Sequence, residues 1–321
     1  MLDFSFASFL DGTFDLDSRT GTHKTPVIHA KSAEAGTKKG LYYDPDYLRD
    51  RPDVETVTVT GMDQAAFERF IRTYGKQLRA IRFFKNKAIC DWSLLAELPE
   101  IEYLDFYQNH RLTSLWDMRG NVSLSGLSVK DFNRFTSIDG IASAPALKYV
   151  SIGNTVIRKM KLESLAPLAG SGIEYFSYSG KDLGDRNLSF LFEMPALKTF
   201  DFPSNLYDTE EVAWISANFP ALTGVSIRPY IEFTEKNGGD GSEEDVRKIV
   251  GKNKPLLIFR GNEERLHGYA RAFEELKERF TGISYEEAFG KKTAGRRKKK
   301  RFVLKKRSSG KKRKEKNEKT N

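Results

Sequence analysis

The sequence predicts an α/β solenoid, in which a short unit is repeated and each strand pairs with the strand of the next unit. The main observation is a six-residue phrase, apolar at its first, fourth and sixth positions, that occurs eight times in 321 residues. Successive phrases begin 24, 23, 23, 23, 26, 24 and 25 residues apart. A fixed period of ~20–29 residues indicates stacked repeats. The phrases occupy residues 54–59, 78–83, 101–106, 124–129, 147–152, 173–178, 197–202 and 222–227.

The second observation concerns which side chains of each phrase are apolar. All 24 of these framework positions are apolar in a chain that is only 39% hydrophobic. Because side chains alternate along a strand, the framework residues are expected to point into a core and the residues between them toward solvent. The sequence therefore predicts a parallel sheet with one buried and one exposed face.

Two of the return segments between phrases have clear helical patterns. Asp63 can cap a helix over 63–74, where apolar residues recur at helical spacing. Asp208 and Glu211 form a capping box at the start of a helix over 208–219. Helices are therefore expected on the side of the sheet that the framework residues face.

The remaining returns are shorter or less regular. Residues 91–98 indicate a short helix, whereas 107–121 and 130–145 carry no apolar stripe and are expected to be 3₁₀ or irregular. Three asparagines follow the last framework residue by three positions, where a buried amide could bond the backbone of the turn: Asn86, Asn109 and Asn205.

The segments before and after the repeats are expected to act as caps. Phe4 and Phe6 alternate as in a short strand, and 18–40 reads as a mobile loop. Beyond the repeats, the patterns predict a helix over 242–250, a strand over 256–260 and an amphipathic helix over 263–280. The first repeat needs a cover for its apolar end, and the N-terminal segment is the candidate.

The charge is distributed unevenly along the chain. The net charge is +9, but residues 291–321 contain 17 Lys and Arg and two Glu, which leaves 36 basic and 42 acidic residues elsewhere. The basic tail has too few apolar residues to fold and is expected to be disordered. The predicted domains are an N-terminal cap (1–53), the solenoid (54–231), a C-terminal helical cap (232–290) and the tail (291–321).

The repeats resemble those of the leucine-rich repeat family. Segments such as IEYLDFYQNHRL (101–112) place three apolar residues and an asparagine at the family's spacing, and the resemblance covers about residues 54–231. The short period and the proline two residues before several phrases are most similar to the bacterial, internalin-like branch. The resemblance implies a parallel sheet on a concave face and recognition of a partner protein. Lys181 and Tyr230 depart from the family, since each stands where it has asparagine.

Aromatic and charged residues gather on the exposed face of the predicted sheet. Exposed aromatic residues among a few charges are typical of protein interfaces, although tyrosine also suits a sheet surface through its β-propensity. We therefore expect a non-catalytic, monomeric module that binds an unidentified partner protein. The candidate binding residues are Arg82, Phe84, Tyr103, Asp105, Tyr107, Lys130, Tyr149, Tyr175 and Asp201.

The tail gives an alternative function. Its basic runs could bind nucleic acid or acidic lipid through salt-sensitive contacts, or could be a solvated tail without a dedicated partner. The candidate residues are Arg296, Arg297, Lys298, Lys299, Lys300, Arg301, Lys311, Lys312, Arg313 and Lys314.

Catalysis has little support in the sequence. The four histidines are scattered, and Cys90, the single cysteine, has no histidine near it in sequence. We expect no catalytic residues, cofactor, metal or small-molecule substrate. One cysteine fits a reducing compartment, and we expect a cytoplasmic protein, or a nuclear one if the basic tail is read by an import receptor.

Overall fold

The computed structural model describes residues 1–16, 25–30, 42–155, 159–236 and 243–290. The chain divides into two compact units, Met1–Thr281 and Gly282–Asn321, and the repeats lie in the first. The second unit is described only from Gly282 to Gly290, where the rings of Tyr285 and Phe289 lie 4.9 Å apart. The candidate basic residues of the tail, from Arg296 to Lys314, lie outside the described residues.

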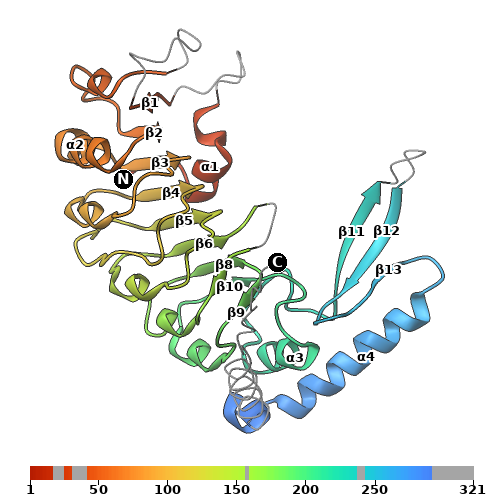
Figure 1. The fold of residues 1–321 in the computed structure, drawn as a ribbon. Helices are drawn as coiled ribbons and strands as arrows, with labels where there is room; N and C mark the ends of the chain where they lie inside the picture. Colours follow the sequence, from red (N-terminus) through yellow and green to blue (C-terminus); the bar gives the residue numbers. More distant parts are fainter. Residues whose placement is uncertain (17–24, 31–41, 156–158, 237–242, 291–321) are drawn as a thin grey trace, which may run out of the picture. The chain divides into compact units, whose positions relative to one another are not determined.

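A parallel sheet of eight strands organises the first unit (Figure 1). Its order, β1-β2-β3-β4-β5-β6-β8-β10, follows the chain, so the strands of the first seven phrases lie side by side in sequence order. This sheet and the helices around it confirm the predicted α/β class. The strands are β1 (Val27–His29), β2 (Thr56–Thr60), β3 (Ala80–Phe84), β4 (Tyr103–Tyr107), β5 (Gly126–Lys130), β6 (Tyr149–Gly153), β8 (Tyr175–Ser179) and β10 (Thr199–Asp201).

The framework residues of successive strands are aligned and buried. Leu104 pairs with Ile81 on one side and Leu127 on the other. All 18 framework residues of the first six phrases are buried, and Leu104 and Val150 are each 0% exposed. The predicted register is therefore confirmed for these phrases, whose burial of apolar surface is the main stabilising contribution.

The residue directly after each of four successive strands adopts a left-handed conformation. The φ angles are 70° at Gly61, 58° at Lys85, 57° at Gln108 and 60° at Asp131. Only glycine adopts this region without a steric cost, so three of these turns are held by their surroundings. The shared conformation turns the chain away from the sheet at the same point of each repeat.

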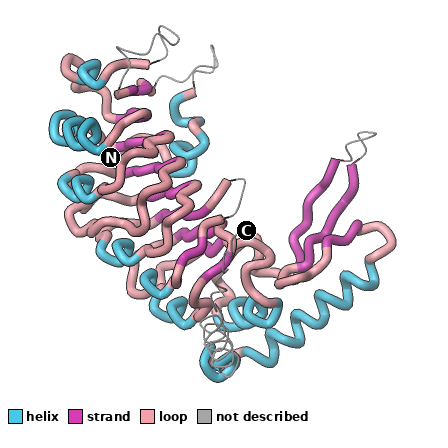
Figure 2. Tube along the Cα trace, in the orientation of Figure 1, coloured by secondary structure: helices cyan, strands magenta, loops and turns pink. Residues whose placement is uncertain are grey.

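The returns contain two α-helices and several short 3₁₀ segments (Figure 2). Helix α2 (Gln64–Tyr74) is capped by Asp63, and α3 (Thr209–Asn218) begins with the capping box of Asp208 and Glu211, both as predicted. The short helix predicted over 91–98 is a 3₁₀ segment. The 3₁₀ segments of the middle returns are Ser93–Glu97, Asp139–Ser143, Ala166–Leu168 and Ser189–Glu193.

Buried asparagine side chains satisfy the backbone of the turns in part of the sheet. Asn86 donates to the Val59 carbonyl at 2.8 Å, and Asn109 donates to the Asn86 carbonyl at 2.9 Å. Asn205 is exposed, so the buried role predicted for it is wrong. Near the later strands, a small parallel pair, β7 (Lys161–Leu162) and β9 (Asp182–Leu183), adds backbone hydrogen bonds instead.

The predicted strand at Phe4 and Phe6 is a helix. Helix α1 (Phe6–Asp11) starts where the Ser5 side chain accepts a hydrogen bond from the Ser8 amide and ends at Gly12, with φ 81°. Cap and glycine together outweigh a two-residue alternation that indicated a strand. Figure 1 shows α1 and α2 on opposite sides of the sheet.

The two ends of the sheet also differ from the prediction. The eighth phrase, 222–227, forms no strand: it contributes one isolated bridge at Thr223, and Val225 is 52% exposed. The eighth strand is β1, which lies in the predicted mobile loop and pairs with β2 through Val27–Thr58 and its neighbours. A strand bonded to β2 therefore covers that edge.

The segment after the repeats is a three-stranded antiparallel sheet followed by a long helix. The strands are β11 (Tyr230–Lys236), β12 (Glu243–Ile249) and β13 (Leu256–Ile258), and the helix is α4 (Glu263–Phe280). The strand at 256–260 and the helix at 263–280 are confirmed. The helix predicted at 242–250 is wrong, because pairing of β12 with strands on both sides outweighs a helical start signal at its first residues.

Candidate protein-binding face

Three rows of side chains form the exposed surface of the sheet, here called the sheet face. The rows come from the third and fifth residues of each phrase and from the residue directly after it, and strand pairing places equivalent residues side by side. The nine candidate residues of the sheet lie on these rows. From β3 to β8 the rows are Ala80, Tyr103, Gly126, Tyr149 and Tyr175; Arg82, Asp105, Ser128, Ser151 and Ser177; and Phe84, Tyr107, Lys130, Gly153 and Ser179.

Part of this face is covered by residues 2–12, here called the N-terminal segment. Phe6 and Phe9 are buried with Ala80 and Tyr103 in one cluster. The Phe6 ring lies 5.4 Å from the Tyr103 ring and 6.5 Å from the Tyr149 ring. Since Tyr103 is only 9% exposed, its predicted place on an open binding surface is wrong: the segment lies over it.

Gly126 makes room for this arrangement. A Cβ atom at position 126 would lie 2.3 Å from Cδ2 of Phe6, which is closer than real contacts allow. The strands on either side carry tyrosine at the same position, so Gly126 leaves a hollow between the rings of Tyr103 and Tyr149. Phe6 fills that hollow.

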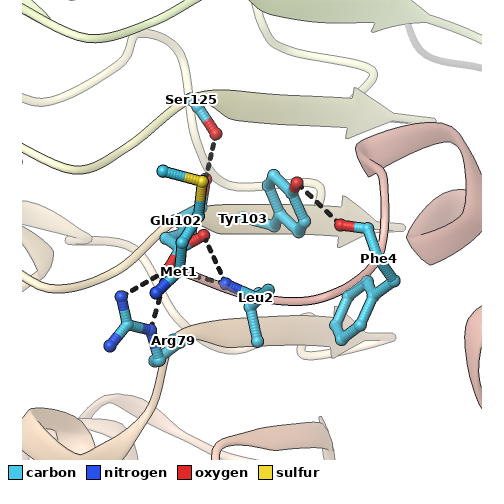
Figure 3. Close-up of polar contacts among 7 residues, drawn as sticks. All are labelled: Met1, Leu2, Phe4, Arg79, Glu102, Tyr103 and Ser125. Atoms are coloured by element: carbon cyan, nitrogen blue, oxygen red, sulfur yellow. Dashed lines mark hydrogen bonds and ion pairs between the residues drawn. The ribbon is translucent and has the colours of Figure 1, made fainter.

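Polar contacts fix the start of the N-terminal segment (Figure 3). The Leu2 amide donates to both carboxylate oxygens of Glu102, at 3.1 and 3.0 Å, and the Tyr103 hydroxyl donates to the Phe4 carbonyl at 2.9 Å. Arg79 Nε also donates to Glu102, at 2.7 Å. Burial alone would raise the pKa of Glu102, but the Leu2 amide and Arg79 outweigh it and lower the pKa below its usual value.

Arg82 holds the other end of the segment. Its Nη2 donates to the carbonyls of Phe9 and Leu10, and its guanidinium lies 5.2 Å from the centre of the Phe9 ring. On the sheet it forms an ion pair with Asp105, with 2.9 Å between Nε and Oδ2. One arginine thus joins the end of α1 to the middle row of the face.

Asp105 and Lys130 carry charges that the sheet shields from water. Burial raises the pKa of Asp105, and the charge of Arg82 opposes this effect. Burial lowers the pKa of Lys130 to about 8, against the opposing charges of Asp105 and Asp131. The Lys130 ammonium donates to the Ser151 hydroxyl at 2.6 Å, so the lysine lies across the sheet.

These residues line a pocket of about 350 Å³ beside the N-terminal segment. Phe84 and Tyr107 form an aromatic wall, with rings 5.3 Å apart and 10° between their planes. The pocket is thus apolar on its wall and charged at its floor. Its lining residues are Leu10, Arg82, Phe84, Asp105, Tyr107, Ser128, Lys130 and Thr155.

A second uncovered area lies on the later strands. Tyr149 is 40% exposed and pairs with Tyr175 on the neighbouring strand. The Tyr175 hydroxyl donates to Asp201 at 3.1 Å, and the other oxygen of Asp201 accepts from the Val225 amide at 2.9 Å. The Tyr149 and Tyr175 rings therefore lie side by side on paired strands, and hydrogen bonds through Asp201 hold the Tyr175 ring in place.

The structure brings eight of the nine candidate residues together in two groups. Five line the pocket, three form the later area, and Tyr103 is covered. Sequence reasoning did not find Phe6, Phe9 and Leu10, which lie outside the repeats. The signal available was the helix-capping pattern of Ser5 and Gly12 around an aromatic, apolar stretch.

Neither a metal-binding cluster nor a membrane-spanning helix occurs within the described residues. No cluster of three His, Cys, Asp or Glu side chains that could hold a metal ion occurs there. No helix within that part of the chain is long and apolar enough to cross a membrane. Comparison with family models gave no match, and comparison with curated protein sequences gave none either.

Proposed function

We propose that this chain is a leucine-rich-repeat-like solenoid that recognises a partner protein through the uncovered part of the sheet face and catalyses no reaction. The observation that carries the proposal is the gathering of Phe84, Tyr107, Lys130, Tyr149 and Tyr175 on the outward side of neighbouring strands, where each is half-buried or exposed. Comparable mixtures of aromatic and charged side chains supply most of the binding energy at protein interfaces.

The solenoid part of the proposal is supported by the repeat period and the pairing of each strand with its sequence neighbours. In such architectures each repeat packs only on adjacent repeats, and the resulting extended surface serves for binding. The resemblance in residues 101–112 adds to this support.

Binding energy and fold stability come from different residues of each strand. Framework residues such as Phe176 are 0% exposed, whereas Tyr175 and Ser177 beside it face outward. Substitutions of outward-facing residues such as Tyr149 and Tyr175 are therefore expected to change affinity with little effect on folding.

The test is site-specific photo-crosslinking in cells that express the protein. A photo-reactive phenylalanine analogue replaces Tyr149, and in a control protein it replaces Phe233, which is 41% exposed on β11. We expect one protein adduct specific to position 149. The identified partner should then bind the wild type, and lose at least about tenfold in affinity to the Tyr149→Ala/Tyr175→Ala variant. The same adducts from both positions, or none from position 149, would contradict the proposal.

A second candidate function concerns the tail. Its 17 basic and two acidic residues within 291–321 favour binding to nucleic acid or acidic lipid, which both present dense phosphate charge. In this alternative the tail supplies the affinity and the sheet face adds selectivity. We also propose that the protein is cytoplasmic, or nuclear if an import receptor binds the basic tail. A salt titration of the full chain tests polyanion binding by the tail.

A further inference from the structure

The N-terminal segment contacts the sheet face in the way that a peptide ligand contacts a receptor. Backbone groups of the segment form hydrogen bonds with side chains of the sheet, namely the Glu102 carboxylate, the Tyr103 hydroxyl and the Arg82 guanidinium. Phe6 and Phe9 enter the face from outside and share no strand ladder with it. A segment held in this way can leave without breaking the sheet's own hydrogen bonds.

We propose that residues 2–12 are an intramolecular ligand, and that a partner protein displaces them by docking a short helix with two aromatic residues three positions apart. The proposal deepens the function above and rests on it, because it names the kind of partner segment that the sheet face accepts. The occupant is thus a helical segment of a partner protein with the pattern aromatic-x-x-aromatic.

The shape of the covered site specifies the aromatic residues. In the row formed by the third residue of each phrase, the small residues Ala80 and Gly126 lie on either side of Tyr103. The hollow at Gly126 admits the Phe6 ring, which is tilted by 50° to the Tyr103 ring and by 29° to the Tyr149 ring. The Phe9 ring lies 5.8 Å from the Tyr103 ring. Aromatic pairs at such distances add to binding beyond the burial of their surface.

The polar contacts of Arg82 recognise the carbonyl groups at the end of a helix and do not depend on the side chains of that helix. A helix leaves its last carbonyl groups without partners inside the helix, and Arg82 donates to two of those of α1, at Phe9 and Leu10. Since these acceptors belong to the backbone, any helix that ends at this point can use Arg82. The selectivity then comes from the aromatic pair, whose spacing places both rings on one side of the helix.

The covalent connection makes the segment a strong competitor. A tethered ligand experiences an effective concentration of about a millimolar, so a partner must bind more tightly than the segment to displace it. Weakening the segment should therefore raise the apparent affinity for a ligand added in trans. This expectation separates a displaceable ligand from a fixed part of the core.

The experiment uses a full-length variant, Phe6→Asp/Phe9→Asp, in which the tethered segment no longer fits. The probe is a fluorescent peptide with the sequence of residues 1–16. We expect the peptide to bind the variant at least about tenfold more tightly than the wild type by fluorescence anisotropy. Binding should disappear when Gly126→Leu is added, because the leucine fills the hollow. Thr199→Leu is the matched control, since Thr199 occupies the same row on β10, separated from β5 by two strands.

A second variant of the chain provides the test if Phe6→Asp/Phe9→Asp does not fold. A protease site inserted within residues 17–24 of the wild type allows the segment to be cut after folding is complete. The labelled peptide should then exchange with the cut segment. No binding to the folded variant and no exchange after cutting would overturn the inference.

The outcomes also separate this inference from the proposed function. Peptide binding without a partner adduct at position 149 would leave the covered site standing and contradict the proposed function. An adduct at position 149 without peptide binding would support the proposed function and contradict the present inference, because the N-terminal segment would then be a permanent part of the fold.

Discussion

Individual side chains of the sheet face carry charge where water has little access. Lys130 is stretched toward Ser151 on the next strand and lies close to both Asp105 and Asp131. The charges of Arg82, Lys130, Asp105 and Asp131 offset one another, which reduces the cost of shielding each from solvent. A partner that binds here would have to preserve this balance.

The first prediction concerns the pH dependence of stability. Lys130 has a pKa of about 8 in the folded chain, below its usual value of 10.5. Between these values the unfolded chain keeps a proton that the folded chain has released, so the free energy of unfolding should rise with pH in this window. We expect wild type to gain stability relative to Lys130→Met from about pH 8 to pH 10.5 in urea titrations. Comparison with the variant removes the effect of tyrosines that titrate above about pH 10. A constant difference between the two proteins would show that Lys130 titrates normally.

The second prediction concerns the framework residues. Leu104 is 0% exposed, so Leu104→Ala should lower the free energy of unfolding by ~2–5 kcal/mol through lost burial and a remaining cavity. Val225 occupies a framework position of the eighth phrase but is 52% exposed. Val225→Ala is the matched control, with an expected change below ~0.5 kcal/mol. Equal losses in chemical denaturation would mean that burial does not separate the two positions.

At the scale of residues, the pattern of the phrases was sufficient to place side chains on the two faces of the sheet. Strand alternation alone determines this, because each residue between framework positions must face outward. The covering of Tyr103 could not be derived in this way. It depends on a contact with Phe4 and Phe6 about 100 residues away in sequence, for which a repeat pattern contains no information.

Among the elements, helix α3 shows how a local signal and a distant contact act together. Glu211 accepts from the Asp208 amide at 2.7 Å, which completes the capping box, and forms a buried ion pair with Arg186 at 3.0 Å. The Arg186 guanidinium also lies 5.2 Å from the centre of the Tyr207 ring. The helix start is thus fixed to the return that follows β9.

The third prediction tests this attachment. Glu211→Ala removes both the cap and the partner of a buried arginine, so the free energy of unfolding should fall by ~3–5 kcal/mol. Glu210→Ala is the control, because Glu210 lies in the same first turn of α3 but is only half-buried. Thermal unfolding followed by circular dichroism measures the difference. Similar melting temperatures for the two variants would contradict the structural role of the ion pair.

The elements that sequence reasoning identified correctly are those with local signals. Caps and apolar periodicity located α2, α3 and α4, because all their determinants lie within about 20 residues. Strand β12 was mistaken for a helix, since its strongest determinant is pairing with β11 and β13. The eighth phrase has the spacing of a repeat but no following strand to pair with, and it forms only a bridge at Thr223.

For the molecule as a whole, the uneven charge suggests two modes of binding with different physical origins. The chain before residue 291 has six more acidic than basic residues, whereas the tail has a net charge of +15. Contacts through aromatic side chains of the sheet face should respond weakly to salt, because they do not depend on counterion release. Contacts through the tail should respond strongly.

The fourth prediction is a salt titration of the full chain. Its binding to duplex DNA, RNA or anionic vesicles should weaken by about 10³-fold or more between 50 and 200 mM salt, if six or more phosphates are neutralised. Replacing the ten candidate basic residues from Arg296 to Lys314 by glutamine should remove this binding. The partner found by crosslinking at position 149 should bind both proteins equally. If the unaltered chain binds none of these polyanions at low salt, the second candidate function is wrong.

The distance in sequence between the N-terminal segment and its site has a consequence for synthesis on the ribosome. Phe6 is translated 120 residues before Gly126, the glycine that accommodates its ring. At about 5–20 residues per second, the segment waits on the order of ten seconds before that part of the sheet exists. During this interval its phenylalanines are available to chaperones. Residues 2–12 are therefore translated well before the part of the sheet that they cover.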